Sequence, residues 1–348
     1  MPMALEVNEL TSLAALERRG PQYEEVFAHS DEKDIFIGLQ WIANWWRVYG
    51  EGRKMLVLEV LENGRPVGYA PFMMSSIGKL LRVRILEFIG TGPSDRLGIL
   101  AEDGRSEVHE AIWKYLDSDS RWDTMDLRDM REDGSTAGIM IEHFPNAQKE
   151  ISMAPFIPLL GEHKDYLSSL TGNVRHSLNR LWRRLSQDHD AKFASYHAPE
   201  DMDFCYRTLL ELNAMRWKTI GTSTLESVQM KEFVRRTVQT HAPKGQIAFH
   251  MLHVRGVPIA ITYGFVFQNR YLYYLSGFNP EYSNYGPGKS LLSKIIEDCY
   301  ARGYDEVDFL RGGEQYKYSL NPINRSMFRV KLENKGLKGR LSGLLRND

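Results

Sequence analysis

The pattern of apolar and polar positions predicts one structural unit that occurs twice along the chain. Residues 55–74 (MLVLEVLENGRPVGYAPFMM) contain two runs with strand character around an Asn-Gly turn, and residues 246–267 (QIAFHMLHVRGVPIAITYGFVF) repeat them around a glycine turn. A further strand follows each hairpin, at 84–89 and at 270–278. The two halves therefore begin with the same order of strands.

Each half continues with a loop, a helix and a short strand. A loop rich in Gly, Pro, Ser and Asp leads into apolar residues at helical spacing, over 106–117 in the first half and 289–302 in the second. The closing strands at 122–127 and 304–309 then align without a gap. Because the helix crosses over the sheet, the closing strand is expected to lie parallel to the strand before the helix. The pattern predicts an α/β fold, with a mixed sheet of the α+β kind, in two tandem domains.

A break in this pattern separates the two copies. Prolines and glycines interrupt regular structure between residues 130 and 166, and a long basic helix is predicted directly after them, over 172–187. We therefore expect an N-terminal domain at 1–150 and a C-terminal domain at 151–348.

Composition and charge restrict the class of protein. Of the 348 residues, 43% are hydrophobic and 26% are charged, which excludes a disordered or collagen-like chain. The 44 Lys and Arg residues are balanced by 45 Asp and Glu residues, so that no binding to DNA is expected. Neither a secretory leader nor a long apolar run is visible. We expect a cytoplasmic protein, at most peripheral at the inner face of a membrane.

No set of residues has the spacing of a metal site. Cys205 and Cys299 have no partner spacing for zinc and cannot form a disulfide framework. His250 and His253 are three residues apart on a predicted strand, which points them to opposite faces. We therefore expect no metal.

An ordered set of short motifs lies between Asn213 and Lys317. The set comprises Arg216-Trp217, Gly256-x-Pro258-x-Ala260, Ser276-Gly277-Phe278, Gly286-Pro287-Gly288, and Asp308-Phe309-Leu310-Arg311-Gly312 followed by Tyr316-Lys317. In this order the motifs resemble the GNAT superfamily in its double-domain FemAB/CelD-like branch, and Ser94-Asp95 in the first half resembles a motif of the same branch. The resemblance implies two acyl-CoA N-acyltransferase folds in one chain. It also implies transfer of an acyl group, acetyl by default, from acyl-CoA to a primary amine of a sugar, lipid or peptide precursor.

The loop before the second predicted helix has the features of an anion site. Glycines flank a proline between a strand and a helix, so that backbone N–H groups and the helix N-terminus can converge on a pyrophosphate. Ser283 occupies the first glycine position of a nucleotide P-loop and Leu291 the last one of a dinucleotide fingerprint, which excludes both motifs. A plain turn before a helix is the structural alternative. We expect coenzyme A to bind Tyr285, Gly286, Gly288, Lys289 and Ser290, with its pantetheine arm along Leu275 and Gly277.

Acyl transfer from a thioester requires a neutral amine, a donor to the oxyanion and a proton for the leaving thiolate. Tyr316 follows the last predicted strand, and its phenol can protonate the sulfur without carrying a charge. Asp308 or Glu314 can accept the proton of the amine, and Lys317 can contact a phosphate or a carboxylate. The alternatives are structural: a core tyrosine, an ion pair of Asp308 with Arg311, and a solvated lysine.

The first copy lacks a Gly-x-Gly loop that leads directly into its helix. We therefore expect this copy to contribute the acceptor side, with Asp95 binding the incoming ammonium. Trp217 is expected to form an aromatic wall that attracts the cation. The resemblance places Arg216 and Arg311 on the substrate side as well.

The predicted helix 172–187 is amphipathic and has a basic face. Its apolar residues gather on one side, and Arg175, Arg180, Arg183 and Arg184 lie on the other. This face is either a solvated surface or a docking site for the phosphates of acyl-CoA, an anionic lipid headgroup or tRNA.

Two other functions are compatible with these residues. One is a FemAB-type transferase that uses aminoacyl-tRNA to extend a peptide. The other is a non-catalytic module in polysaccharide or envelope assembly. Ser283 favours the second, because single-domain GNAT enzymes usually carry Arg or Gln at this position.

Overall fold

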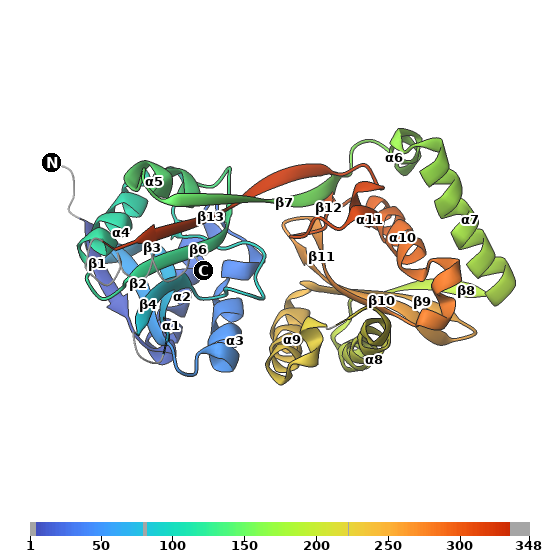
Figure 1. The fold of residues 1–348 in the computed structure, drawn as a ribbon, viewed down its shortest axis with the longest axis horizontal. Helices are drawn as coiled ribbons and strands as arrows, with labels where there is room; N and C mark the ends of the chain where they lie inside the picture. Colours follow the sequence, from blue (N-terminus) through green and yellow to red (C-terminus); the bar gives the residue numbers. More distant parts are fainter. Residues whose placement is uncertain (1–4, 79–81, 222, 335–348) are drawn as a thin grey trace. The chain divides into compact units, whose positions relative to one another are not determined.

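The computed structural model describes residues 5–78, 82–221 and 223–334 (Figure 1). None of the helices in these three ranges is long and apolar enough to cross a membrane.

The chain folds into two compact units. The first runs from Met1 to Ser152 and includes the segment that starts at Ser326, whereas the second runs from Met153 to Arg325. The domain boundary expected at residue 150 stays a prediction.

The first unit is a mixed sheet with helices packed on it. Its elements are β1 (Leu5–Leu10), α1 (Leu13–Arg18), α2 (Gly20–Ala28), η1 (Ile35–Ile37), α3 (Leu39–Tyr49), β2 (Lys54–Glu62), β3 (Arg65–Ile77), β4 (Val83–Phe88), β5 (Leu100–Ala101), α4 (Ser106–Ser118), β6 (Thr124–Arg131) and α5 (Ser135–His143). The strands β1-β2-β3-β4-β6 are neighbours in this order, and β4 and β6 are parallel. Helix α4 crosses between them and packs on β1, β2 and β3, as the spacing of the apolar residues predicts.

The second unit repeats this plan. Its elements are α6 (His163–Ser169), α7 (Gly172–His189), β8 (Ala191–Tyr196), η2 (Pro199–Asp201), α8 (Met202–Ile220), η3 (Thr224–Glu226), α9 (Val228–His241), η4 (Ala242–Lys244), β9 (Ile247–Val254), β10 (Val257–Phe267), β11 (Arg270–Phe278), η5 (Pro280–Tyr285), α10 (Pro287–Arg302), β12 (Glu306–Asp308) and α11 (Gln315–Tyr318). The strands β12-β11-β10-β9-β8 are neighbours, with β11 and β12 parallel. Figure 1 shows α10 on one face of this sheet and α8 and α9 on the other. The predicted tandem α/β fold is confirmed.

Strand β7 (Gln148–Pro158) lies where the sequence suggested a break in regular structure. Pro155 and Pro158 are both part of this strand. A strand accepts proline wherever the ladder does not need its N–H group. The carbonyl of Pro155 still accepts a hydrogen bond from Phe309 N at 3.0 Å. The chain therefore enters the second unit as a strand and not as an irregular linker.

Strand β13 (Ile323–Glu333) returns the chain to the first unit. It pairs antiparallel with β6 between Met327 and Glu333. Arg329 donates hydrogen bonds to Asp126 of β6 at 2.7 and 2.8 Å. The C-terminal half of the sequence thus supplies one strand of the first sheet, which the repeat pattern does not predict.

Helix α8 approaches β11 closely where the strand carries Gly277. A Cβ atom at Gly277 would lie 2.3 Å from the backbone nitrogen of Asn213. Asn213 Nδ2 also donates to the carbonyl of Ser276 at 2.8 Å. Glycine is required here because the helix backbone occupies the space of a side chain. The sequence suggested that Gly277 allows a pantetheine arm to approach the strand. In the structure it is the backbone of α8 that lies against this glycine.

Gly277→Ala is expected to destabilise the protein by about 1–3 kcal/mol, because the added methyl group overpacks the contact between α8 and β11. The melting temperature should fall by roughly 2–4 °C per kcal/mol. Gly288→Ala is the matched control, since a Cβ atom there has no other atom within 4 Å. Differential scanning calorimetry measures both variants, and equal melting temperatures would contradict the proposed packing role of Gly277.

Candidate functional site

The second unit contains a cavity of about 260 Å³. It lies among β10, β11, η5, the first turn of α10, and α11. Six of the residues predicted from the sequence line this cavity: Arg216, Gly277, Gly286, Gly288, Lys289 and Tyr316. The other predicted residues of this unit do not line the cavity: Trp217, Leu275, Tyr285, Ser290, Asp308, Arg311, Glu314 and Lys317.

One wall of the cavity is the part of β11 beyond its pairing with β12. The two parallel strands pair only from Arg270 to Leu272 of β11. Among the described residues, no other strand pairs with this edge farther along. The pairing of β11 with β10 is irregular between Tyr263 and Gly264, and such a bulge turns backbone groups out of the ladder. Backbone N–H and C=O groups beyond Leu272 can therefore pair with an extended ligand.

The first turn of α10 forms the opposite wall. Gly286 takes a left-handed conformation (φ 58°) before Pro287, which starts the helix. The first helical hydrogen bond is donated by Ser290 N to Gly286 O at 3.0 Å, so the N–H groups of Gly288 and Lys289 precede it. A Cβ atom at Gly288 would meet no atom within 4 Å. This turn offers two N–H groups and the positive end of the helix dipole to an anion.

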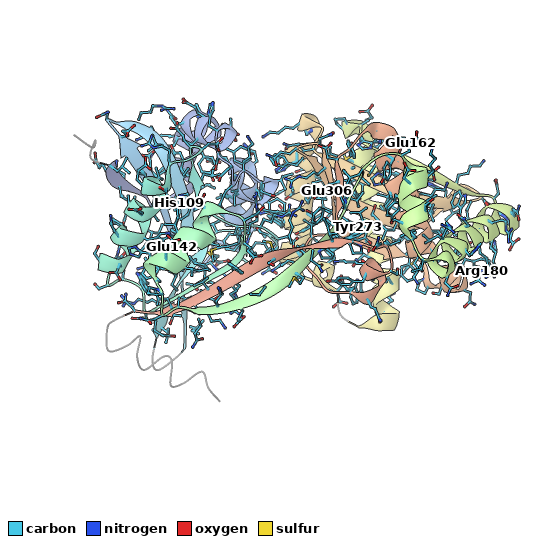
Figure 2. The ribbon with its side chains drawn as sticks, turned by 90° about the horizontal axis from the view of Figure 1, so that it is seen from above. His109, Glu142, Glu162, Arg180, Tyr273 and Glu306 are labelled. Atoms are coloured by element: carbon cyan, nitrogen blue, oxygen red, sulfur yellow. The ribbon has the colours of Figure 1, made fainter. Side chains whose placement is uncertain are left out.

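Tyr316 of α11 lines the cavity and is held beside Tyr273 of β11. Burial is the main cause that raises the pKa of Tyr316 above its ordinary value, and Tyr273 and Glu314 raise it further. The phenol is therefore protonated at neutral pH and can donate a proton. The sequence interpretation missed Tyr273 (labelled in Figure 2), which lies one residue beyond the end of the β11–β12 pairing.

Lys317 holds the loop between β12 and α11 together. Its side chain is 3% exposed and its Nζ lies 2.7 Å from Glu314 Oε2. The ammonium also donates to the carbonyls of Phe309, Arg311 and Gly312 at 3.1, 3.0 and 3.3 Å. An ammonium has three N–H donors, so these four acceptors already use its hydrogen-bonding capacity. Lys317 is thus a positioning residue for α11, in contrast to the phosphate contact suggested by the sequence.

Asp308 ends β12 and is fully buried. Its Oδ1 accepts a hydrogen bond from Leu310 N at 2.7 Å, and its Oδ2 accepts one from Arg325 Nη1 at 3.0 Å. Arg325 also pairs with Glu306, which is labelled in Figure 2. Burial, followed by the charge of Asp308, raises the pKa of Glu306. Arg325 is thus one ion-pair partner of Asp308, and the sequence interpretation did not consider it.

Arg216 of α8 extends toward β11. Its Nη1 donates to Ser276 Oγ at 2.7 Å, and its guanidinium lies 5.5 Å from the ring of Phe278. The same group lies 5.3 Å from the ring of Trp217, its neighbour along the chain. Arg216 therefore brings a positive charge to the cavity wall, and the ring of Trp217 lies beside that charge.

Comparisons with known proteins support the fold. Residues 172–318 match the family described as the acetyltransferase (GNAT) domain. A crystal structure of FemX matches with a TM-score of 0.65 at 10% identity, covering 98% of this chain and 99% of that chain. The chain has a double-domain GNAT fold.

Two further solved structures have a fold similar to that of this chain. One is the C-terminal domain of a putative lysylphosphatidylglycerol synthetase from Agrobacterium fabrum, with a TM-score of 0.57 at 10% identity, covering 94% of this chain and 96% of that chain. The other is L-PGS from Bacillus licheniformis, with a TM-score of 0.55 at 9% identity and the same coverage of 94% and 96%. No curated protein matches the sequence.

The basic helix α7 packs against η5 and α10. Leu181 of α7 would lie 2.9 Å from a Cβ atom at Gly286. The guanidinium of Arg184 lies 4.7 Å from the ring of Tyr285, and Arg180 and Arg183 are exposed. Arg180 projects from the outer part of α7 in Figure 2. Arg184 thus lies beside Tyr285, shortly before the first turn of α10, and two further exposed arginines lie on the same helix.

Arg175 has another environment. Its Nη1 donates to the carbonyl of Leu167 at 3.4 Å, and the residue is half-buried. It therefore links α7 to the end of α6.

Asp95 belongs to the first unit, in the loop that follows β4. It is 9% exposed. Its neighbours fix this loop, since Trp41 Nε1 donates to Ser94 Oγ at 2.8 Å and Arg96 Nη1 lies 3.1 Å from Asp34 Oδ2. The role of Asp95 in binding the acceptor ammonium stays a prediction.

Gly288→Val is expected to prevent binding of free coenzyme A, because the added side chain fills the space in front of the α10 amides. Isothermal titration calorimetry measures the affinity. The melting temperature of the unliganded variant should stay within a few degrees of wild type, which separates a blocked site from a misfolded domain. Unchanged affinity for coenzyme A would exclude this turn as the anion site.

Proposed function

We propose that the protein is a GNAT-type N-acyltransferase that transfers an acyl group, acetyl by default, from acyl-CoA to a primary amine. The observation that carries the proposal is the cavity in which the open edge of β11, the first turn of α10 and the phenol of Tyr316 meet. The proposed reaction requires no metal.

The donor would occupy this cavity in two parts. Its pyrophosphate would accept hydrogen bonds from the N–H groups of Gly288 and Lys289, with the Lys289 ammonium adding charge attraction. Its pantetheine arm would run along β11 beyond Leu272 and pair with the open strand edge. Both parts are consistent with the order of the lining residues, because β11 leads through η5 into α10.

The reaction requires one proton to leave the amine and one to reach the sulfur. The neutral amine attacks the thioester carbonyl, and the backbone N–H groups of β11 stabilise the oxyanion. When the tetrahedral intermediate collapses, Tyr316 protonates the leaving thiolate and is reprotonated from solvent. For the amine proton we favour Glu314 acting through water, because its side chain is 56% exposed whereas Asp308 is buried against Arg325.

A second function, aminoacyl transfer from aminoacyl-tRNA, is favoured by the similarity to FemX over nearly the whole of both chains. The exposed arginines Arg180, Arg183 and Arg184 lie on α7, which packs against η5 and α10, and they suit a large polyanion as well as the phosphates of coenzyme A. In this alternative the same cavity would bind the aminoacyl adenosine end of the tRNA.

Thermal stabilisation distinguishes the donors. At a concentration of about 100 times its dissociation constant, the true donor should stabilise the fold by about 2.7 kcal/mol. We expect acetyl-CoA or a longer acyl-CoA to raise the melting temperature, and Gly288→Val to abolish the effect. A shift with aminoacyl-tRNA alone would select the second function, and no shift with either donor would contradict acyl transfer.

Tyr316→Phe is expected to lower the turnover number about 100-fold or more, because it removes the proton donor and keeps the ring. The dissociation constant of the donor should change little, since the phenol acts mainly in the transition state. Tyr318→Phe, an exposed tyrosine of the same helix, is the matched control and should retain full activity. Equal turnover of Tyr316→Phe and wild type would assign Tyr316 to packing.

A further inference from the structure

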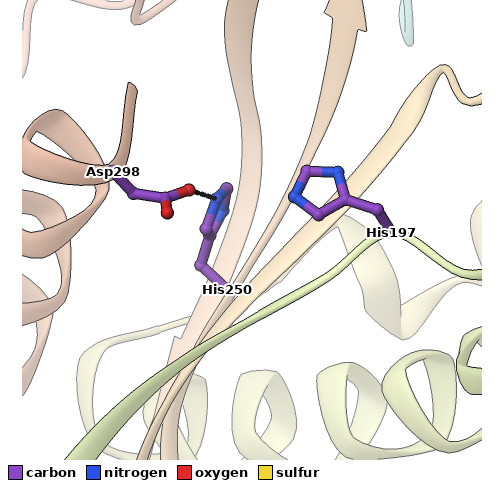
Figure 3. A group of neighbouring side chains, drawn as sticks. All are labelled: His197, His250 and Asp298. Carbon is purple, nitrogen blue, oxygen red and sulfur yellow. Dashed lines mark ion pairs between the residues drawn. The ribbon is translucent and has the colours of Figure 1, made fainter. Parts of the chain in front are cut away.

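A second group of polar side chains lies in the second unit, outside the lining of the cavity. His197 follows β8, His250 lies on β9 and Asp298 lies on α10. One ligand-type atom from each residue lies within 4.8 Å of the others. Figure 3 shows the ring of His250 between the carboxylate of Asp298 and the ring of His197. Three elements that are distant in the sequence thus bring together two imidazoles and one carboxylate.

The side chain of His197 has an unsatisfied nitrogen. Its Nε2 is buried and has no hydrogen-bond partner in the part of the chain that the structure describes. A buried polar atom without a partner is costly and therefore rare in folded proteins. The ring is directed toward His250 in Figure 3. A cation between the two rings would satisfy the lone pair of this nitrogen.

The other two side chains are oriented as metal ligands usually are. His250 Nδ1 shares a hydrogen bond with the Tyr271 hydroxyl at 3.3 Å, and its Nε2 lies 3.6 Å from Asp298 Oδ2. Oδ2 accepts hydrogen bonds from Arg302 Nε at 2.7 Å and from Ser195 Oγ at 3.2 Å. Outer partners of this kind fix the direction of ligating histidines and carboxylates. A cation bound to His250 Nε2 would replace the approach of this nitrogen to Oδ2, while Arg302 and Ser195 can keep their contacts with the carboxylate.

We propose that His197, His250 and Asp298 bind one Zn²⁺ ion. Two imidazole nitrogens and one carboxylate oxygen suit Zn²⁺, whereas Mg²⁺ and Ca²⁺ take mainly oxygen ligands. Zinc bonds of about 2.0–2.2 Å place neighbouring ligand atoms roughly 3.4 Å apart, so the side chains close by about an ångström on binding. His197 makes most of this movement, because it lies on a loop and is only half-buried. Water supplies the fourth ligand.

Arg302 limits the affinity of this site. Its guanidinium lies against the carboxylate of Asp298, so a bound ion adds positive charge beside an existing one. Repulsion between like charges is stronger at a partly buried site than in water. Neutralising Arg302 should therefore strengthen zinc binding, an effect that histidines binding zinc elsewhere on the surface would not show.

The proposed zinc site and the cavity share helix α10 and a hydrogen bond between Tyr271 and Thr262. Tyr271, which holds His250, also shares a hydrogen bond at 3.1 Å with Thr262, a lining residue of the cavity. Asp298 belongs to α10, whose first turn forms the anion wall. Bound zinc would fix α10 to β9 and to the loop after β8. This proposal does not depend on the proposed acyl transfer.

Titration of the full chain with Zn²⁺, after removal of metals with a chelator, tests the site by isothermal titration calorimetry. We expect one equivalent to bind with an increase in melting temperature. His197→Ala should weaken zinc binding about 100-fold or more. Loss of a residue that only hydrogen-bonds to a metal ligand already lowers metal affinity about 10- to 100-fold. Asp298→Asn gives an independent test that preserves the size of the side chain.

Two further variants complete the test. His253→Ala, on the same strand as His250, is the matched control and should bind zinc as wild type does. Arg302→Gln should bind it more tightly. Absence of one-to-one binding in the wild type, or equal affinity in wild type and His197→Ala, would overturn the proposal. Binding that His197→Ala weakens and Arg302→Gln strengthens would establish it.

Discussion

The parallel pairing of β11 with β12 ends at Leu272 and Asp308, and the cavity exists because the two strands part there. Asp308 stabilises the chain where the pairing ends. Its carboxylate accepts the N–H group of Leu310, which takes a left-handed conformation (φ 57°), so the chain leaves the sheet at once. Arg325 neutralises the buried carboxylate. A side chain that the sequence offers as a proton acceptor thus ends the pairing and leaves the edge of β11 open.

The same loop contains a buried cation whose partners are backbone carbonyls. Lys317 binds the carbonyls of three residues between β12 and α11, and a buried ammonium is tolerated only when it is paired in this way. Because Tyr316 is the preceding residue, these contacts also determine where its phenol lies. Replacement of Lys317 would therefore disturb the position of Tyr316 even without any contact of Lys317 with a substrate.

The two copies differ in the loop that follows β4 in the first copy and β11 in the second. In the second copy the loop leads through Gly286 and Pro287 into α10 and lines a cavity. In the first copy Ser94 and Arg96 are buried and bound to Trp41 and Asp34 of the preceding segment. Polar groups that could face a ligand are thus used to hold the first loop in place.

Local patterns in the sequence determined the repeated strands, the crossover helices and the Gly-Pro-Gly turn, because the side-chain period and the conformational limits of glycine and proline act over a few residues. Pairing between distant segments was decided only by the tertiary structure. It includes β13 in the first sheet, Arg325 beside Asp308, and the approach of α8 that requires Gly277. His197, His250 and Asp298 meet for the same reason: no short spacing relates them, and only the packing of β8, β9 and α10 brings their side chains together.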